Sequence, residues 1–460
     1  MNAYEYARAH EAEFLGQLQE LLRIPSVSTS SEHAGDVRRA AEWLRAHLQQ
    51  IGLRNVELIE TPKHHPLVYG EWLEAGPDAP TVLLYGHYDV QPADKDGGEW
   101  TKCADPFEPT IADGNIYARG ATDDKGQTFA QLKALESALA TGSLPVNVKV
   151  LLEGEEESGS EAIEQYVRAH PERLACDVVV VSDSHILSLE QPSILSGLRG
   201  IVALEVTVSG PKSDLHSGMY GGAVHNPAQA LAEILAALHD DCGRVAVPGF
   251  YDNVRELSLE ERAELAKVPY TAEQLAQETG VPAPWGEHGY SLHERTGIRP
   301  TLEINGLTAG WQGEGSKTII PQKASAKITC RLVPDQDPER IGQLVAEHIA
   351  ALTPPTVTSA VEVGHAGMWA EADPHSPYME AAARAYAFGF GAEPVFTREG
   401  GSIPIVATFQ SVLGAPVILM GFGLPDDNLH APDEKLSLEC FRRGIQTALK
   451  FYEELRALPR

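Results

Sequence analysis

The stretch TVLLY, at residues 81–85, decides the fold. It is short, apolar and rich in residues that favour β-structure, so it predicts a buried strand. The strand runs directly into the polar sequence GHYD at residues 86–89. The first candidate for chemistry therefore lies where a buried strand ends.

Three further runs have the same character: VNVKVLL at 146–152, DVVVV at 177–181 and PVILM at 416–420. A helix is expected between the first strand and the second, over about 126–140. Strands that alternate with helices are typical of an α/β fold with a mainly parallel central sheet.

The pattern changes near residue 200. The runs IVALEVTVS (201–209) and SAKITCRL (325–332) alternate apolar and polar residues, as half-exposed antiparallel strands do. The simplest interpretation is a discontinuous α/β domain over residues 1–200 and 365–460, interrupted by a smaller α+β domain over 201–364.

Polar side chains follow each of the predicted buried strands. They include His87, the acidic run at 153–157, Asp183 and, beyond a glycine-rich turn, His430. A fifth cluster, GATDDKG at 120–126, precedes a helix. Each feature alone also fits an ordinary structural histidine, helix cap or solvated turn. Together they fall at strand ends that should share one edge of the sheet. Mixed nitrogen and oxygen ligands of this kind suit Zn²⁺, Mn²⁺ or Co²⁺.

Asp89 lies two residues after His87 and, in an extended segment, points in the same direction. A metal-bound histidine usually donates its second ring N–H to a carboxylate, which fixes the tautomer of the ring. We expect Asp89 to serve His87 in this way, with an ordinary turn aspartate as the alternative.

Charge and composition exclude several classes of protein. The 460 residues carry a formal net charge of −29, which argues against nucleic acid or an anionic membrane as partner. No apolar run is long enough for a membrane helix, and the N-terminal residues do not form a signal peptide. The chain has five cysteines, which are dispersed along the sequence and do not have the paired spacing of a metal knuckle. This pattern favours a reducing, cytoplasmic location.

The motifs resemble those of the M20 metallopeptidases, most closely the branch of cytosolic nonspecific and carnosine-type dipeptidases. The similar segments are GHYDVQP at 86–92, DPFEPTIADGNIYARGATDDKG at 105–126, EGEEESGS at 153–160, VSD at 181–183 and DLHSGMYGG at 214–222. They occur in the family's order and extend the resemblance over nearly the whole chain.

The resemblance implies two divalent metal ions per subunit, with Zn first and Mn or Co as alternatives. One ion would be held by His87, Asp123 and Asp183, and the other by Asp123, Glu157 and His430, so that Asp123 bridges the pair. It also implies a cis peptide bond between Asp123 and Asp124.

Further roles are implied by the same resemblance. Glu156 matches the general base. His216 matches a histidine that reaches the other subunit of a homodimer and polarises the substrate carbonyl, and Thr318 matches a second residue supplied across the dimer. Arg331 and Ser402 match residues that receive the terminal carboxylate of the substrate. The inserted domain would then serve as lid and dimerisation domain.

We therefore expect a dinuclear metallohydrolase that cleaves the peptide bond of dipeptides or short peptides. One alternative is an N-acyl amino acid deacylase or desuccinylase with the same machinery. A second is a metal-binding homologue without catalysis, although all five expected ligands and the base are present.

Overall fold

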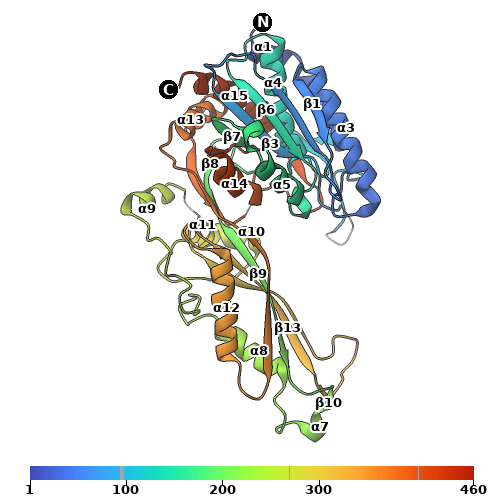
Figure 1. The fold of residues 1–460 in the computed structure, drawn as a ribbon, viewed down its shortest axis with the longest axis vertical. Coiled ribbons are helices and arrows are strands. Elements are labelled where there is room, and N and C mark those ends of the chain that lie inside the picture. Colours follow the sequence, from blue (N-terminus) through green and yellow to red (C-terminus); the bar gives the residue numbers. More distant parts are fainter. Residues whose placement is uncertain (94–97, 269, 402, 460) are drawn as a thin grey trace. The chain divides into compact units, whose positions relative to one another are not determined.

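The computed structural model describes residues 1–93, 98–268, 270–401 and 403–459, which fold into two compact units (Figure 1). The first unit comprises Met1–Ser196, Ala372–Thr397 and Ile405–Arg460, and the second comprises Gly197–Glu371 and Arg398–Pro404.

The segment Arg398–Pro404 belongs to the second unit, whereas the sequence interpretation assigned it to the α/β domain. Local contacts explain the difference. Arg398 donates to Glu371 at 2.6 Å, and the backbone N–H of Arg199 donates to the carbonyl oxygen of Glu399 at 3.3 Å.

The central sheet of the first unit has a parallel core. Its strands lie in the order β1-β2-β6-β3-β7-β17-β8, and β6, β3, β7 and β17 pair in parallel. β1, β2 and β8 pair antiparallel outside this core. The mainly parallel sheet expected from the sequence is confirmed. The strands are β1 (Arg54–Ile59), β2 (Leu67–Trp72), β3 (Thr81–His87), β6 (Asn147–Glu153), β7 (Val178–Val181), β17 (Val417–Leu419), β8 (Ser193–Leu198) and β16 (Val395–Glu399), which pairs with β8.

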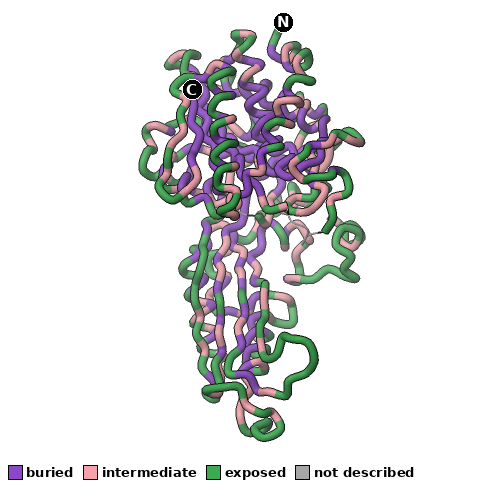
Figure 2. Tube along the Cα trace, turned by 90° about the vertical axis from the view of Figure 1, so that its right-hand side faces the viewer, coloured by how far each residue is buried: buried purple, intermediate pink, exposed green. Residues whose placement is uncertain are grey.

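Strand β3 is apolar between its end residues Thr81 and His87 because both of its faces are covered. Val82 and Leu84 join the core formed with the long helices. Tyr85 faces the other way and meets Phe409 edge to face, with ring centroids 5.5 Å apart. A strand enclosed on both sides has no solvated face and so lacks polar alternation. Figure 2 shows that buried residues are concentrated in this unit.

Helices cover the sheet, as Figure 1 shows for α3 and α4. α13 and α15 pack on each other and extend the same core. The helical segments of this unit are α1 (Ala3–Ala9), α2 (Glu11–Leu22), the 3-10 turn η1 (Ser31–His33), α3 (Ala34–Gln50), α4 (Lys125–Ala140), the 3-10 turn η3 (Glu156–Ser158), α5 (Glu161–Ala169), α6 (Pro171–Leu174), α13 (Pro377–Phe390), α14 (Pro404–Thr408), the π-turn η4 (Phe409–Leu413) and α15 (Leu438–Arg456).

A small antiparallel sheet joins distant parts of the first unit. Its strands are β4 (Thr110–Ala112), β5 (Asn115–Tyr117) and β18 (Lys435–Ser437), with Lys435 opposite Tyr117. The pairing brings a segment near the C-terminus beside the loop that leads into α4.

The second unit has its own antiparallel sheet, in the order β11-β13-β9-β14, with α8 and α12 packed on it. β9 alternates buried and less buried residues, as its sequence predicts. The elements are β9 (Gly200–Ser209), β10 (Leu215–His216), α7 (Ser217–Tyr220), α8 (Pro227–Ala236), α9 (Leu259–Leu265), α10 (Ala272–Thr279), α11 (Leu292–Gly297), β11 (Thr301–Ala309), β12 (Ile319–Ile320), β13 (Lys323–Leu332), α12 (Pro338–Leu352), β14 (Thr358–Gly367) and β15 (Ala370–Glu371).

Among the described residues, none of the helices combines the length and the apolar character that crossing a bilayer requires.

Candidate metal centre

Five side chains of the first unit gather at the carboxyl end of its parallel strands. His87 closes β3, and Glu157 lies in the turn η3 after β6. Asp183 follows β7, and His430 follows β17. Asp123 lies just before α4. Because parallel strands all end at one edge of the sheet, residues far apart in sequence meet there.

These side chains form two groups that share Asp123. His87, Asp123 and Asp183 make one group, and Asp123, Glu157 and His430 make the other. Within each group, one ligand atom from every residue lies within 4.8 Å of the others. The structure thus brings all five predicted ligands together.

Asp123 faces both groups with different oxygen atoms. Its Oδ1 lies 3.1 Å from Nε2 of His87, and its Oδ2 lies 2.9 Å from Nε2 of His430. Nε2 of His87 is also 3.8 Å from Asp183, and Nε2 of His430 is 3.5 Å from Glu157. One carboxylate therefore stands between two imidazole rings.

The acids in and beside the two ligand groups have shifted pKa values because their side chains are buried close together. Burial, reinforced by neighbouring carboxylates, raises the pKa of Glu156 to about 9, of Glu157 to about 7 and of Asp183 to about 6. Burial also opposes ionisation of Asp123, but hydrogen bonds from His430 and His87 hold its pKa well below the usual range. A cluster of acids that burial and mutual repulsion disfavour as anions is stabilised by cations. The donor set therefore fits divalent metal ions.

Asp89 is fully buried beneath His87. Nδ1 of His87 lies 3.1 Å from the carbonyl oxygen of Asp89 and 3.4 Å from its carboxylate. With Nδ1 engaged, Nε2 is left to face the group of acids. The carboxylate of Asp89 also accepts the backbone N–H groups of Glu156 and Glu157, at 3.2 and 3.1 Å. The sequence did not reveal this second contact, because hydrogen bonds to backbone amides leave no mark on residue type.

Glu156 belongs to neither ligand group, although it adjoins Glu157 in the turn η3. The peptide bond between Asp123 and Asp124 is cis, as the family resemblance implies.

Three further predicted residues, His216, Thr318 and Arg331, lie in the second unit. His216 ends β10 opposite Ile319 of β12, and the N–H of Ser217 donates to the carbonyl oxygen of Thr318 at 3.0 Å. His216 and Thr318 are therefore neighbours. Arg331 lies near the end of β13, where burial lowers the pKa of its guanidinium. Ser402 lies outside the described residues.

Within one subunit, His216 and Arg331 are far apart. β10 and β12 lie near the Lys323 end of β13, since Gln322 donates to Asp214 and Lys323 pairs with Ser209. Arg331 lies eight residue steps along the extended strand from Lys323, a span of about 26 Å.

Residues 83–454 match the family model for Peptidase family M20/M25/M40. The chain belongs to this family. The expectation of an M20-type metallopeptidase is thereby confirmed.

Full-length relatives agree with the M20 assignment. The Cys-Gly metallodipeptidase of Schizosaccharomyces pombe is 33% identical, over 99% of this chain and 98% of its own. The crystal structure of human carnosine dipeptidase 1 has a TM-score of 0.84 at 30% identity, covering 99% of this chain and 98% of that one. The M20 family metallo-carboxypeptidase Sso-CP2 of Sulfolobus solfataricus has a TM-score of 0.86 at 32% identity, covering 97% and 100%.

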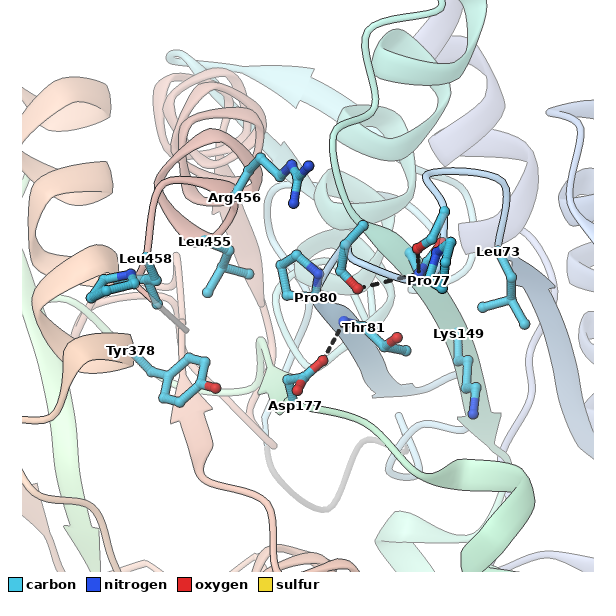
Figure 3. A pocket seen from close by; sticks show the side chains of 14 residues that line it. Leu73, Pro77, Pro80, Thr81, Lys149, Asp177, Tyr378, Leu455, Arg456 and Leu458 are labelled. Atoms are coloured by element: carbon cyan, nitrogen blue, oxygen red, sulfur yellow. Dashed lines mark hydrogen bonds between the residues drawn. The ribbon is translucent and has the colours of Figure 1, made fainter.

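A separate cavity lies elsewhere in the first unit. It measures about 980 Å³ and is lined by Thr81 and Asn147, at the amino ends of β3 and β6 (Figure 3). Asp177, also in its wall, accepts the backbone N–H of Thr81 at 2.7 Å. Ligands of α/β sheets bind outside the carboxyl ends of the strands, so the ligand groups and not this cavity mark the candidate site.

Proposed function

We propose that this protein is a dipeptidase that depends on two divalent metal ions, with Zn²⁺ first and Mn²⁺ or Co²⁺ as alternatives. The observation that carries the proposal is the position of Asp123 between His87 and His430, with one oxygen toward each. A shared carboxylate suits a pair of ions. The relatives named for Cys-Gly and carnosine dipeptidase activity support dipeptides as the substrate class.

The two ligand groups would hold one ion each. When bound, such ions polarise a carbonyl group and make water more acidic. Glu156 belongs to neither group, so its carboxylate is available to accept the proton of the attacking water and pass it to the leaving amine. Asp89 supports this role because it holds the backbone of Glu156 and Glu157.

His216 would stabilise the negative charge that develops on the substrate oxygen. The N–H of Gly218 donates to Nδ1 of His216 at 3.0 Å, so in the neutral ring the proton is on Nε2. The side chain is exposed and can donate from Nε2 to an oxygen that becomes negative.

We propose that His216 acts on the substrate of a partner subunit in a homodimer. An extended dipeptide spans at most about 7 Å, whereas His216 and Arg331 of one subunit are separated by several times this length. If Arg331 binds the terminal carboxylate, the histidine must come from another copy. Thr318, beside His216, would enter the same partner site, and Ser402 would assist Arg331.

A cytoplasmic location completes the proposal. All five cysteines are free thiols, and burial raises the pKa of Cys103, Cys176, Cys330 and Cys440. Unpaired cysteines are typical of proteins in a reducing compartment.

Removal of metal should abolish hydrolysis. Exhaustive treatment with a chelator is expected to reduce the turnover of a dipeptide such as Cys-Gly to background, because the acids of both ligand groups lose their compensating cations. Zn²⁺, Mn²⁺ and Co²⁺, added separately to the apoprotein, should restore activity to different extents and identify the preferred metal. Full activity after chelation, with metal analysis showing none bound, would refute the proposal.

A substrate screen distinguishes the dipeptidase from the alternative deacylase. Free dipeptides should be hydrolysed faster than N-acetyl and N-succinyl amino acids. Amidation of the dipeptide C-terminus should raise KM, because Arg331 then loses its charged partner. The Arg331→Met variant should show the same high KM for the free dipeptide and for the C-terminally amidated dipeptide. Preferred cleavage of N-acyl amino acids would favour the deacylase instead.

A further inference from the structure

Asp123 can face both ligand groups only if its backbone is held in one place. The loop that carries it, residues 118–124, is called here the Asp123 loop. A second loop, residues 427–435, carries His430 and is called the His430 loop. The two loops are separated by about three hundred residues of sequence and meet at the candidate metal centre.

Glu434, in the His430 loop, is fully buried and spans the Asp123 loop with both oxygens. Its Oε1 accepts the backbone N–H groups of Thr122 and Asp123, at 3.1 and 3.2 Å. Its Oε2 accepts the N–H of Gly120 at 3.0 Å and Nη1 of Arg119 at 2.6 Å. Four donors from consecutive parts of one loop therefore converge on a single carboxylate.

The backbone of Glu434 adds a fifth contact to the same loop. Its carbonyl oxygen accepts the N–H of Ala118 at 3.1 Å, next to the pairing of Lys435 with Tyr117. Asp427, at the other end of the His430 loop, accepts the hydroxyl of Thr122 at 3.0 Å. The His430 loop thus holds the Asp123 loop from both of its ends.

The positive charge of a neighbouring side chain explains why residue 434 is an acid. The guanidinium of Arg119 is almost completely buried and compensates the carboxylate of Glu434. An amide in place of the carboxylate would turn an N–H group toward donors of the Asp123 loop, because only one of its two terminal atoms accepts hydrogen bonds. The Glu434→Gln substitution therefore preserves the shape of the side chain but breaks half of its hydrogen bonds to the Asp123 loop.

We propose that Glu434 is a positioning residue that locks the Asp123 loop to the His430 loop and so sets the separation between Asp123 and His430. It belongs to neither ligand group and acts through the backbone that carries Asp123. The inference rests on the proposed function, because it assigns the shared position of Asp123 to metal binding. Since Asp123 belongs to both ligand groups, loss of Glu434 affects both ions, unlike loss of a ligand from one group.

The test measures metal binding by the apoprotein without substrate. Glu434→Gln is titrated with Zn²⁺ against a competing chelator, and with Co²⁺ to record the visible spectrum. Changes to residues that support metal ligands typically weaken binding by about 10–100-fold. We expect weakening in this range for both metal equivalents, together with an altered Co²⁺ spectrum. His430→Ala should weaken one equivalent more than the other.

A buried ion pair in the second unit provides the matched control. Glu287 accepts Nε and Nη2 of Arg299 at 2.7 and 2.8 Å, and the two side chains are 9% and 4% exposed. Glu287→Gln should lower the melting temperature of the protein but leave both metal dissociation constants and the Co²⁺ spectrum unchanged.

Metal affinity and Co²⁺ spectrum equal to those of the unmodified protein in Glu434→Gln would overturn the inference. An equal change in Glu287→Gln would also overturn it, since the effect would then be one of general destabilisation. If Glu434→Gln does not fold, Glu434→Asp is measured, because it keeps the buried charge but is too short to span both pairs of donors. Glu434→Asp should weaken the binding of both metal equivalents as Glu434→Gln does. Unchanged metal affinity in Glu434→Asp would again refute the positioning role of Glu434. Failure of the unmodified protein to bind two ions would instead refute the proposed function, before any variant is compared.

Discussion

Replacing Glu156 by glutamine is expected to lower kcat by about 10²–10⁴-fold, the usual contribution of a general acid or base. Glutamine keeps the size of the side chain and the backbone N–H that Asp89 accepts, but it cannot take a proton. Both metal equivalents should remain bound, because Glu156 belongs to neither ligand group. Steady-state kinetics and metal analysis of the same preparation measure the two properties.

The neighbouring variant Glu157→Gln separates the two acids of the turn. It should lose metal from the group that contains His430, so that its activity depends on the concentration of added metal. Near-normal kcat in Glu156→Gln would place the base elsewhere. Loss of metal by Glu156→Gln would show that it is a ligand rather than a proton carrier.

Mixing two inactive variants should restore activity if His216 acts across a dimer. His216→Ala is expected to lower kcat by about 10²–10³-fold, as does the loss of a donor to a developing oxyanion. In a mixed dimer with Glu156→Ala, the site that retains Glu156 receives an intact His216 from its partner. The other site lacks both groups.

Random reassortment should recover about one quarter of wild-type activity, since half of the dimers are mixed and each contains one complete site. The control is the double variant, with both changes in one chain, mixed with the Glu156→Ala variant. In this mixed dimer neither chain carries Glu156. Both sites therefore lack the general base, and no recovery is expected. Absence of recovery in the first mixture, with mixed dimers demonstrated by size or tag, would place the action of His216 within its own subunit.

Much of the first unit could be predicted from sequence because its chemistry coincides with the ends of regular elements. TVLLY and DVVVV are recognisable as buried strands, and parallel pairing then brings His87 and Asp183 to one edge. The antiparallel strands β1 and β2 were not predicted. Register and strand neighbours arise from contacts distant in sequence, which local composition does not encode.

The contacts that support the site were harder to foresee than its candidate ligands. Asp89 was expected beside His87, but its hydrogen bonds to the amides of Glu156 and Glu157 depend on the path of the backbone. Glu434 ends the stretch NLHAPDE at residues 428–434, which has the composition of an exposed turn, yet its side chain is completely buried. The pairing of β5 with β18 brings Glu434 to the buried guanidinium of Arg119 and to the backbone donors of the Asp123 loop, and these contacts explain why an acid is buried there.

The contact between the Asp123 loop and the His430 loop determines when, during synthesis, the two ligand groups become complete. His87, Asp123, Glu157 and Asp183 all leave the ribosome long before His430, which lies within the last segment of the first unit. A nascent chain therefore lacks one ligand of the second group until His430 has been added. On the proposed function, a peptide-cleaving centre becomes competent only after the segment that carries His430 has been translated. A chain that ends before His430 would lack one ligand of the second group, and it would also lack helix α15, which belongs to the core of the first unit.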